Sequence, residues 1–395
     1  MVEQEDLESD WSLVTDDATL THAAADLAAG HGPVGVDAER ASGFRYGSEA
    51  YLVQVYRRGA RTYLFDPTTI SDFAPLASAL AGEEWILHSA SQDLPCLEQL
   101  GLLPETLFDT ELAARLLGFE RVGLGAIVEQ LLGIRLHKAH SAADWSQRPL
   151  PEAWLDYAAF DVALLPDLRD AIAGELDSQQ KTEFARQEFD AVRTKPAKAV
   201  SDQPWRRLSG VARLKTAREL AIARELWLSR DALARERDLG PGRLIPDASI
   251  VVAAAAQPRS AGHLASLRDF KGRASRSELD RWWAAILRAK TSDELPELRY
   301  REPGTIPHHR SWAQRHPEAA ARLSAARELL TTEAERLNIP LENLLTPELL
   351  RRVAWDPPSE PTSEAIASQL HELGARDWQI AITAPLISRI FVELL

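Results

Sequence analysis

The chain has 395 residues, of which 45% are hydrophobic and 26% are charged, a composition typical of a globular protein with room for two or three domains. Its one cysteine, Cys96, excludes an intrachain disulfide framework and a zinc site built from several cysteines, and it fits a reducing compartment. No stretch approaches the roughly 18 apolar residues of a membrane span, and no apolar segment follows the acidic first ten residues. We therefore expect a cytoplasmic protein that does not bind a membrane.

The formal net charge of −14 is unevenly distributed. Residues 1–175 carry 11 Lys and Arg against 29 Asp and Glu, whereas residues 193–290 carry 21 against 10. The acidic average argues against a nucleic-acid partner, because phosphate binding usually leaves a basic footprint. The excess of basic residues in 193–290 removes that objection. The charges indicate an acidic N-terminal part followed by a basic segment.

Residues 34–175 alternate between strand and helix patterns. Short β-branched and aromatic runs predict strands at GPVGVDAE, YLVQVYR, TYLFDP and WILH. Capping and terminating residues predict helices from Ser71 through Leu80, from Ser91 to Gly101, from Asp109 to Gly118, from Gly123 to Gly133, and from Pro151 to about Glu175. This order of elements is typical of an α/β domain.

After residue 193 the pattern is helical. The segment TKPAKAVSDQPW, residues 194–205, reads as a linker or loop. A repeat then appears at an offset of 100 residues, in which Leu239, Leu244, Ile245, Ile250 and Ala254 correspond to Ile339, Leu344, Leu345, Leu350 and Ala354. We expect a domain at 1–192, a linker at 193–210, a helical module at 211–292, a second linker at 293–309 and a second helical module at 310–395.

Acidic residues mark three of these elements. The two-residue period of the first strand places Asp37 and Glu39 on one face, beside Gly35. Carboxylate oxygens are the ligands that Mg²⁺ or Mn²⁺ prefers. A D-x-E pattern by itself is weak evidence, because it more often marks a solvated strand end.

Two further acids follow the same logic. Asp93 in HSASQDL stands in the first turn of a helix, where charge complementarity with the helix dipole explains it as well. Tyr157 and Asp161 are four residues apart on one helix face, which a buried tyrosine partnered by an aspartate also explains. Taken together, acids from several elements are what a two-metal phosphodiester hydrolase requires.

At these residues the chain resembles the DEDD exonuclease superfamily, in the subgroup with a catalytic tyrosine, and within it the ribonuclease D family. The motifs that carry the resemblance are VDAER, HSASQDL with FDT, and YAAFD, supported by YLVQV and DWSQRPL. The segment LWLSRDALARERDLGPGRLIPD resembles the HRDC module. The resemblance implies a ribonuclease H-like α/β exonuclease domain followed by two all-α HRDC-like helical modules.

The resemblance also implies a mechanism. Two divalent metal ions, Mg²⁺ or Mn²⁺, would be held by Asp37, Glu39, Asp93 and Asp161, and Tyr157 would orient the attacking water. The implied activity is hydrolysis of single-stranded RNA from its 3′ end, releasing 5′-mononucleotides, with tRNA precursors and other small structured RNAs as substrates. Asp109 in FDT is an additional acid whose position favours a helix cap.

Residues near the motifs are candidates for holding the substrate. Those that could contact RNA through charge, ring or amide are Arg45, Tyr46, Gln54, Lys138 and Arg148, although packing or surface charge explains each of them equally. His88 is either a substrate-binding group or a structural hydrogen-bonding residue. In the first helical module, the residues that could line a binding face, or simply form a solvated charged face, are Arg213, Lys215, Arg268, Lys271 and Arg273. Trp227, Trp282 and Trp283 are expected in the core.

Other functions stay open. The same acids serve DNA exonucleases, and a catalytically silent RNA-binding adaptor would keep the fold. HRDC modules also accompany helicases, but the absence of a G-x-x-x-x-G-K-[ST] motif argues against a helicase. The sequence leaves protein partners unknown.

Overall fold

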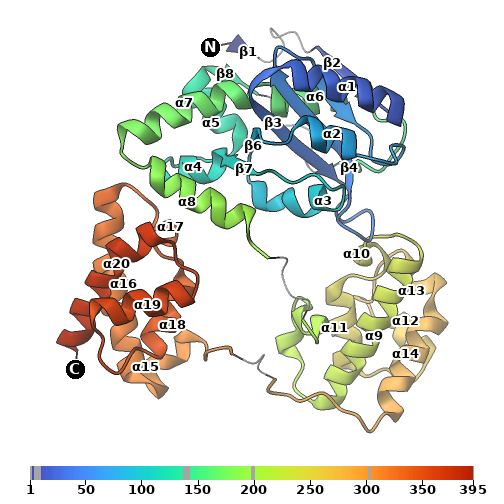
Figure 1. Ribbon diagram of the computed structural model, residues 1–395. Helices are drawn as coiled ribbons and strands as arrows, with labels where there is room; N and C mark the ends of the chain where they lie inside the picture. The colour runs from blue at the N-terminus through green and yellow to red at the C-terminus, as the bar shows by residue number, and fades with distance from the viewer. Residues whose placement is uncertain (1, 4–9, 137–142, 197–200, 301–303, 395) are drawn as a thin grey trace.

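The computed structural model describes residues 2–3, 10–136, 143–196, 201–300 and 304–394. The first part of the chain, from β2 to α8, is built around a six-stranded mixed sheet (Figure 1). We call it the catalytic domain, because it contains the residues to which the resemblance assigns catalysis. In spatial order its strands are β2 (Trp11–Val14), β5 (Thr62–Phe65), β4 (Ala50–Arg58), β3 (His31–Arg40), β6 (Glu84–Leu87) and β7 (Thr106–Asp109). Strand β4 is antiparallel to both of its neighbours, and the other pairs are parallel. A separate parallel pair joins β1 (Val2–Glu3) to β8 (Ile134–Arg135).

Strand β3 follows the predicted two-residue period. Val34, Val36 and Ala38 are buried in the main core, into which helices α1 (Asp17–Ala29) and α2 (Ala74–Ala79) also pack. Helices α6 (Glu152–Ala163) and α7 (Leu165–Ser178) contact β3, and Gly35 lies against the junction between them. The acids of the D-x-E motif therefore face α6 and α7, because they alternate with the apolar residues of the strand.

The helices between Asp93 and Gly133 lie within their predicted limits. They are α3 (Leu94–Glu98), α4 (Thr110–Leu116) and α5 (Leu124–Leu132). The prediction of one helix from Pro151 to about Glu175 is wrong, because the chain breaks at Leu164 into α6 and α7. Pro166 in the first turn of α7 has no N–H with which to continue the hydrogen bonds of α6.

The first helical module, from η3 to α14, has its own core. Its elements are η3 (Pro204–Arg207), η4 (Val211–Arg213), α9 (Ala217–Glu236), α10 (Pro241–Leu244), α11 (Asp247–Ala256), α12 (Ala261–Ser266), α13 (Ala274–Ser277) and α14 (Leu279–Thr291). Trp282 is fully buried there, and Trp227 and Trp283 pack against the same cluster, as expected from the sequence. Trp205 and Leu208, which the sequence placed in a linker, are also buried in this core.

The second helical module, from η5 to α20, repeats part of the first. It contains η5 (His309–Ser311), α15 (Trp312–Arg315), α16 (Pro317–Leu337), α17 (Leu341–Leu344), α18 (Pro347–Trp355), α19 (Ser363–Glu372) and α20 (Asp377–Glu393). Helices α16, α17 and α18 begin 100 residues after α9, α10 and α11, in line with the sequence repeat. Division of the chain at 193–210 and 293–309 stays a proposal, since 197–200 and 301–303 lie outside the described residues.

The second helical module packs directly on α8 (Thr182–Arg193) of the catalytic domain (Figure 1). The indole of Trp378 stacks on Phe184 with ring centroids 4.5 Å apart, and its Nε1 donates to Glu188 at 3.0 Å. Arg376 pairs with the same carboxylate, which is 4% exposed. Trp378 belongs to the main core of the catalytic domain, so the two parts share buried apolar surface.

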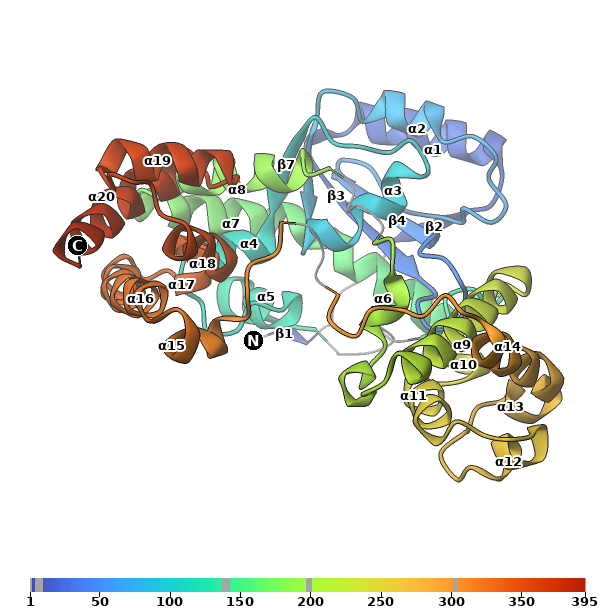
Figure 2. The ribbon, with the colours of Figure 1, turned by 90° about the horizontal axis from the view of Figure 1, so that it is seen from below.

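The first helical module contacts the catalytic domain through a short segment, residues 43–46. Gly240 N donates to Phe44 O at 2.9 Å, and Arg243 Nε donates to Gly43 O at 2.9 Å. The guanidinium of Arg243 also lies 4.0 Å from the centre of the Phe44 ring. Figure 2 shows the two helical modules on either side of the catalytic domain. Among the described helices, none has the length and apolar character that would let it cross a membrane.

Candidate active site

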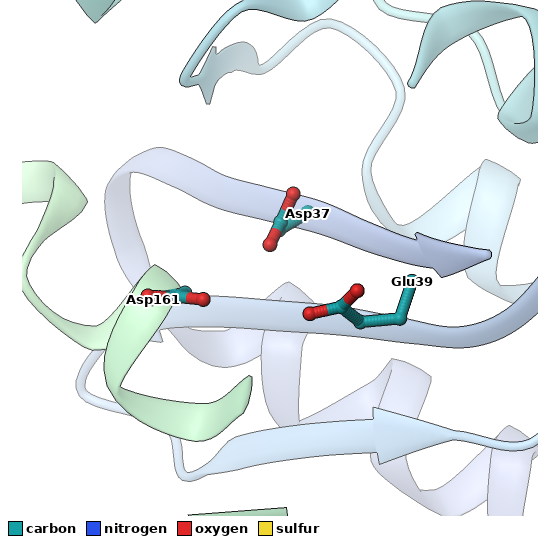
Figure 3. Close-up of side chains that lie close together, drawn as sticks. All are labelled: Asp37, Glu39 and Asp161. Atoms are coloured by element: carbon teal, nitrogen blue, oxygen red, sulfur yellow. The ribbon is translucent and has the colours of Figure 1, made fainter. Parts of the chain in front are cut away.

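Three carboxylates meet at the face of the sheet that α6 covers. Asp37 and Glu39 extend from β3 and Asp161 from the last turns of α6, and each offers an oxygen within 4.8 Å of the others (Figure 3). All three side chains are partly exposed. A compact set of oxygen ligands from two elements suits a hard divalent cation.

Gly35 allows this close approach of α6 to the strand. A Cβ atom on Gly35 would lie 2.7 Å from the carbonyl oxygen of Val162 and 3.2 Å from Cβ of Leu165. Val162 follows Asp161 directly, and Leu165 begins α7. The missing side chain therefore permits the end of α6 to come near enough for Asp161 to join the two acids of β3.

The carboxylates open into a cavity of about 500 Å³. Besides the three acids it is lined by Ala38, Arg40, His88, Ser89, Gln92, Asp93, Gly123, Leu124, Gly125, Leu136, Tyr157 and Leu165. The cavity thus contains all five residues to which the resemblance assigns a role in catalysis.

Asp93 reaches the cavity from the turn between η2 (Ala90–Gln92) and α3, and it is 5% exposed. Its Oδ1 lies 3.3 Å from Nη2 of Arg40, and Nη1 of Arg40 donates to Gln92 O at 2.6 Å. Arg40 was not among the residues predicted for the site. The signal for it was its position next to Glu39, which places a cation at the edge of the acidic cluster.

Burial raises the pKa of all four acids, and repulsion from neighbouring carboxylates adds to the increase for Glu39, Asp93 and Asp161. Burial raises the pKa of Glu39 to about 10, with further increases from Asp37, Asp161 and Asp93. Burial and the charge of Asp37 raise the pKa of Asp93 to about 8, although Arg40 opposes this. Burial also raises the pKa of Asp37 to about 6, and the pKa of Asp161 is raised by burial and by Asp37. A site that resists ionisation in this way is one that bound cations would stabilise.

Tyr157 stands one helical turn before Asp161 and hydrogen-bonds to its carboxylate. Burial, together with this acidic neighbour, raises the pKa of the phenol above its ordinary value. The hydroxyl therefore keeps its proton and acts as a donor at the edge of the cavity.

His88 also lines the cavity, and its Nδ1 lies 2.9 Å from Oγ1 of Thr110. Burial, with a smaller effect of Arg115, lowers the pKa of the imidazole to about 4. The neighbouring acid Asp109 caps α4 by accepting hydrogen bonds from the backbone N–H groups of Glu111 and Leu112. The cap that the sequence favoured for Asp109 is thus confirmed.

Two residues predicted to contact RNA are buried or fully engaged. Gln54 lies opposite Asp37 in the β3–β4 ladder and is 0% exposed, so its amide cannot contact RNA. All three guanidinium nitrogens of Arg148 donate within the protein, to Asp66 and to three backbone carbonyls. Arg148 therefore fastens the DWSQRPL segment to the sheet.

Arg45 and Tyr46 face the first helical module and do not line the cavity. Arg45 Nη1 lies 3.2 Å from Asp238, and the Tyr46 hydroxyl donates to Asp231 at 3.0 Å. Lys138 lies outside the described residues. Of the six predicted substrate-binding residues, the structure places His88 in the cavity.

Comparisons with known proteins agree with this geometry. Residues 12–177 match a family model described as 3′-5′ exonuclease, residues 219–286 match the HRDC domain, and residues 305–391 match a 3′ to 5′ exonuclease C-terminal domain. Ribonuclease D of Granulibacter bethesdensis is 31% identical over 320 residues, which is 78% of this chain and 76% of that protein. Ribonuclease D of Pseudomonas paraeruginosa is 30% identical, with 76% of this chain and 78% of that protein covered.

Solved structures extend the similarity to nearly the whole chain. A protein from Bifidobacterium adolescentis aligns with a TM-score of 0.88 at 36% identity, covering 98% of this chain and 100% of that chain. Escherichia coli RNase D, described as an exoribonuclease involved in structured RNA processing, aligns with a TM-score of 0.68 at 26% identity, covering 92% and 98%. The chain therefore belongs to the ribonuclease D family of metal-dependent 3′-to-5′ exoribonucleases.

Proposed function

We propose that this protein shortens single-stranded RNA 3′ ends by a two-metal-ion hydrolysis that releases 5′-mononucleotides. The observation that carries the proposal is the group of carboxylate oxygens from Asp37, Glu39 and Asp161 within 4.8 Å of one another. Asp93 lines the same cavity and completes a set of four acids, enough to share between two hard cations.

The four acids would hold the ions, which would activate a water for attack and stabilise negative charge on the leaving 3′ oxygen. Tyr157 would orient the water through its hydroxyl oxygen, because the hydroxyl donates its hydrogen to Asp161 and the residue lines the same cavity. The walls of the cavity would receive the terminal nucleotide. We propose Mg²⁺ or Mn²⁺ as the ions, because oxygen ligands suit both.

We further propose that the first helical module holds the body of the RNA. Arg268, Lys271, Arg273 and Arg276 surround a surface hollow of about 420 Å³ on this module. All four are exposed. Cations gathered in this way bind phosphates without reading sequence. Precursors of tRNA and other small structured RNAs are the substrates we favour, and the cytoplasm is the location we favour.

The catalytic proposal is tested with purified protein, single-stranded RNA, a 3′-extended tRNA and single-stranded DNA, with Mg²⁺, with Mn²⁺ and with EDTA. We expect shortening of RNA from its 3′ end by the wild type in either metal, none in EDTA, and none by Asp37→Ala, with RNA binding retained. Glu98→Ala, which removes an exposed acid on α3, is the matched control and should stay active.

Equal shortening by wild type and Asp37→Ala, or by neither, contradicts the proposal. Shortening of DNA alone would support a DNA exonuclease, and metal-independent RNA binding without shortening would support an adaptor.

The RNA-holding proposal needs its own variant. Removing residues 211–395 would also remove Trp378 and other residues of the catalytic core, so truncation confuses binding with stability. The triple variant Arg268→Ala, Lys271→Ala, Arg273→Ala avoids this. We expect weaker RNA binding. The slope of the logarithm of the binding constant against the logarithm of the salt concentration should become shallower by about one for each phosphate that is no longer neutralised. A double variant of exposed arginines in the second helical module, Arg310→Ala with Arg389→Ala, is the control.

A further inference from the structure

The hydrogen bonds around His88 fix which of its ring nitrogens carries the proton. Oγ1 of Thr110 donates its single hydrogen to the carbonyl oxygen of Leu87 at 3.3 Å. The same Oγ1 lies 2.9 Å from Nδ1 of His88, and with its own hydrogen directed at Leu87 it accepts one from that nitrogen. The imidazole is neutral near pH 7, because burial lowers its pKa to about 4. Nδ1 therefore carries the proton, and Nε2 is an acceptor.

The acceptor is available to a ligand. His88 lines the cavity that holds the catalytic acids, whereas Thr110, which holds Nδ1, is 0% exposed. Within the described part of the chain Nε2 has no hydrogen-bond partner, and it is not among the buried polar atoms that lack one. His88 also does not join the group of metal-binding atoms formed by the acids of β3 and α6. Its free nitrogen thus points to a ligand other than the ions.

The chemistry of an acceptor limits what it can bind. Phosphate oxygens have no hydrogen to donate, so Nε2, which is also an acceptor, would repel the phosphates of the RNA backbone. Base amino groups differ from one nucleotide to the next, whereas an exonuclease meets a ribose hydroxyl in every cycle. Two neighbouring side chains at this wall are already engaged, since Arg40 pairs with Asp93 and Ser89 Oγ donates to Glu111.

We infer that Nε2 of His88 accepts a hydrogen bond from the 2′-hydroxyl of the 3′-terminal ribose, and that this contact gives the enzyme its preference for RNA over DNA. The inference rests on the proposed function and deepens it, because the four acids serve RNA and DNA alike. The 2′-hydroxyl is the group that distinguishes the two polymers.

The test compares three oligonucleotides that differ at the 3′-terminal nucleotide alone, which carries a 2′-hydroxyl, 2′-hydrogen or 2′-fluorine. Fluorine keeps an RNA-like sugar pucker but cannot donate a hydrogen bond. For the wild type we expect kcat/KM for release of the terminal nucleotide to be roughly fivefold to tenfold higher with the hydroxyl than with either replacement, the worth of one neutral hydrogen bond. The experiment is repeated with all four terminal bases.

Variants assign the preference to His88. His88→Asn can keep the hydrogen bond to Thr110 but has no atom at the position of Nε2. We therefore expect kcat/KM for the 2′-hydroxyl substrate to fall to the value of the other two substrates. Thr110→Val, which cannot contact RNA, should reduce the preference because Nδ1 loses its acceptor. His22→Asn, on the exposed face of α1, is the matched control and should keep the wild-type ratio. Thermal unfolding of each variant, with and without Mn²⁺, separates these effects from misfolding.

The inference is overturned if the wild type does not distinguish the hydroxyl from fluorine, if His88→Asn slows all three substrates equally, or if the preference follows the terminal base. None of these results would contradict the proposed function, which is tested separately by metal-dependent shortening with the wild type and its loss in Asp37→Ala. Loss of that metal dependence would instead overturn the proposed function.

Discussion

Nη2 of Arg40 lies 3.3 Å from Oδ1 of Asp93, so one of the four acids already faces a cation. The two residues come from different elements, since Arg40 ends β3 and Asp93 stands between η2 and α3. Their side chains are 27% and 7% exposed, which weakens screening by water. The pair therefore balances part of the acidic cluster, and a metal ion that approaches Asp93 must compete with it.

Replacing Arg40 should reveal this competition. In Arg40→Gln we expect the half-saturating concentration of Mn²⁺ to fall severalfold, since a competing positive charge is removed. The EDTA-treated variant should unfold at a lower temperature than the wild type, because the acids lose a partner. Metal titration of activity and thermal unfolding are the measurements. Arg61→Gln, at an exposed pair with Asp10, is the control, and an unchanged half-saturation point would show that Arg40 does not compete.

The raised pKa values of the acids predict how stability depends on pH. The pKa is raised to about 6 for Asp37, about 8 for Asp93 and about 10 for Glu39. Between its ordinary pKa and these values each acid binds its proton more tightly in the folded than in the unfolded protein, so stability decreases as pH rises. With EDTA we expect the unfolding temperature to fall from about pH 5 to about pH 9.

Bound metal should reverse this trend, because the ions favour the deprotonated acids. The increase in unfolding temperature caused by Mg²⁺ should therefore become larger as pH rises. Metal binding should also release protons from the acids, which titration calorimetry detects as a binding heat that depends on the ionisation enthalpy of the buffer. The variant Glu39→Gln should flatten the pH dependence in EDTA. A wild-type unfolding temperature that rises across this range would contradict the assignment.

Tyr157→Phe should slow the reaction less than loss of a carboxylate. It removes one hydroxyl that would orient the water, and we expect kcat to fall roughly tenfold to a hundredfold with little change in KM. Asp161→Asn should cost on the order of 10³-fold or more, because several kcal/mol of charge stabilisation disappear. Single-turnover rates measure both. Tyr56→Phe on β4, outside the cavity, is the control, and an equal loss in the Tyr157 and Asp161 variants would assign Tyr157 a larger role.

Gly35→Ala should separate the acids. The new methyl group would lie 2.7 Å from the Val162 carbonyl, so the end of α6 must move away from β3. We expect weaker Mn²⁺ binding and a large loss of activity in a protein that still folds. Gly174→Ala on α7, where nothing lies within 4 Å of the added atom, should keep activity and gain about 0.5–1 kcal/mol of stability. Wild-type metal affinity in Gly35→Ala would contradict this account.

Glu188→Ala should loosen the second helical module. The change leaves the Arg376 guanidinium and the Trp378 indole without their shared acceptor, which costs about 2–4 kcal/mol for a buried pair. Scanning calorimetry should show a lower transition temperature. Glu183→Ala, whose side chain is 58% exposed on the same helix, should change stability little, and equal effects of the two variants would argue against the buried contact.

Sequence patterns predicted local features well. The two-residue period of β3 placed Asp37 and Glu39 on one face, and the 100-residue repeat predicted the correspondence between α9–α11 and α16–α18. Both follow from short-range rules of strand alternation and helix termination.

Features that depend on packing between distant segments were missed. The burial of Gln54 depends on its place in β4 beneath α6. The break at Leu164 is a different case, because Pro166 marks it locally within a continuous apolar pattern. Arg45 and Tyr46 looked like RNA contacts because arginine and tyrosine serve RNA and protein surfaces equally. Only the folded chain distinguishes these uses.

The two helical modules contact the catalytic domain in different ways, and this difference determines how easily each module could be exchanged for another domain. Exchange of the second module requires matched changes in α8, because Trp378 and Glu188 are parts of one core. The first module meets the catalytic domain through backbone and side chains of residues 43–46, so a related domain with a compatible surface can replace it by recombination. The first module can accordingly be exchanged as a unit, whereas the second can be exchanged only together with α8.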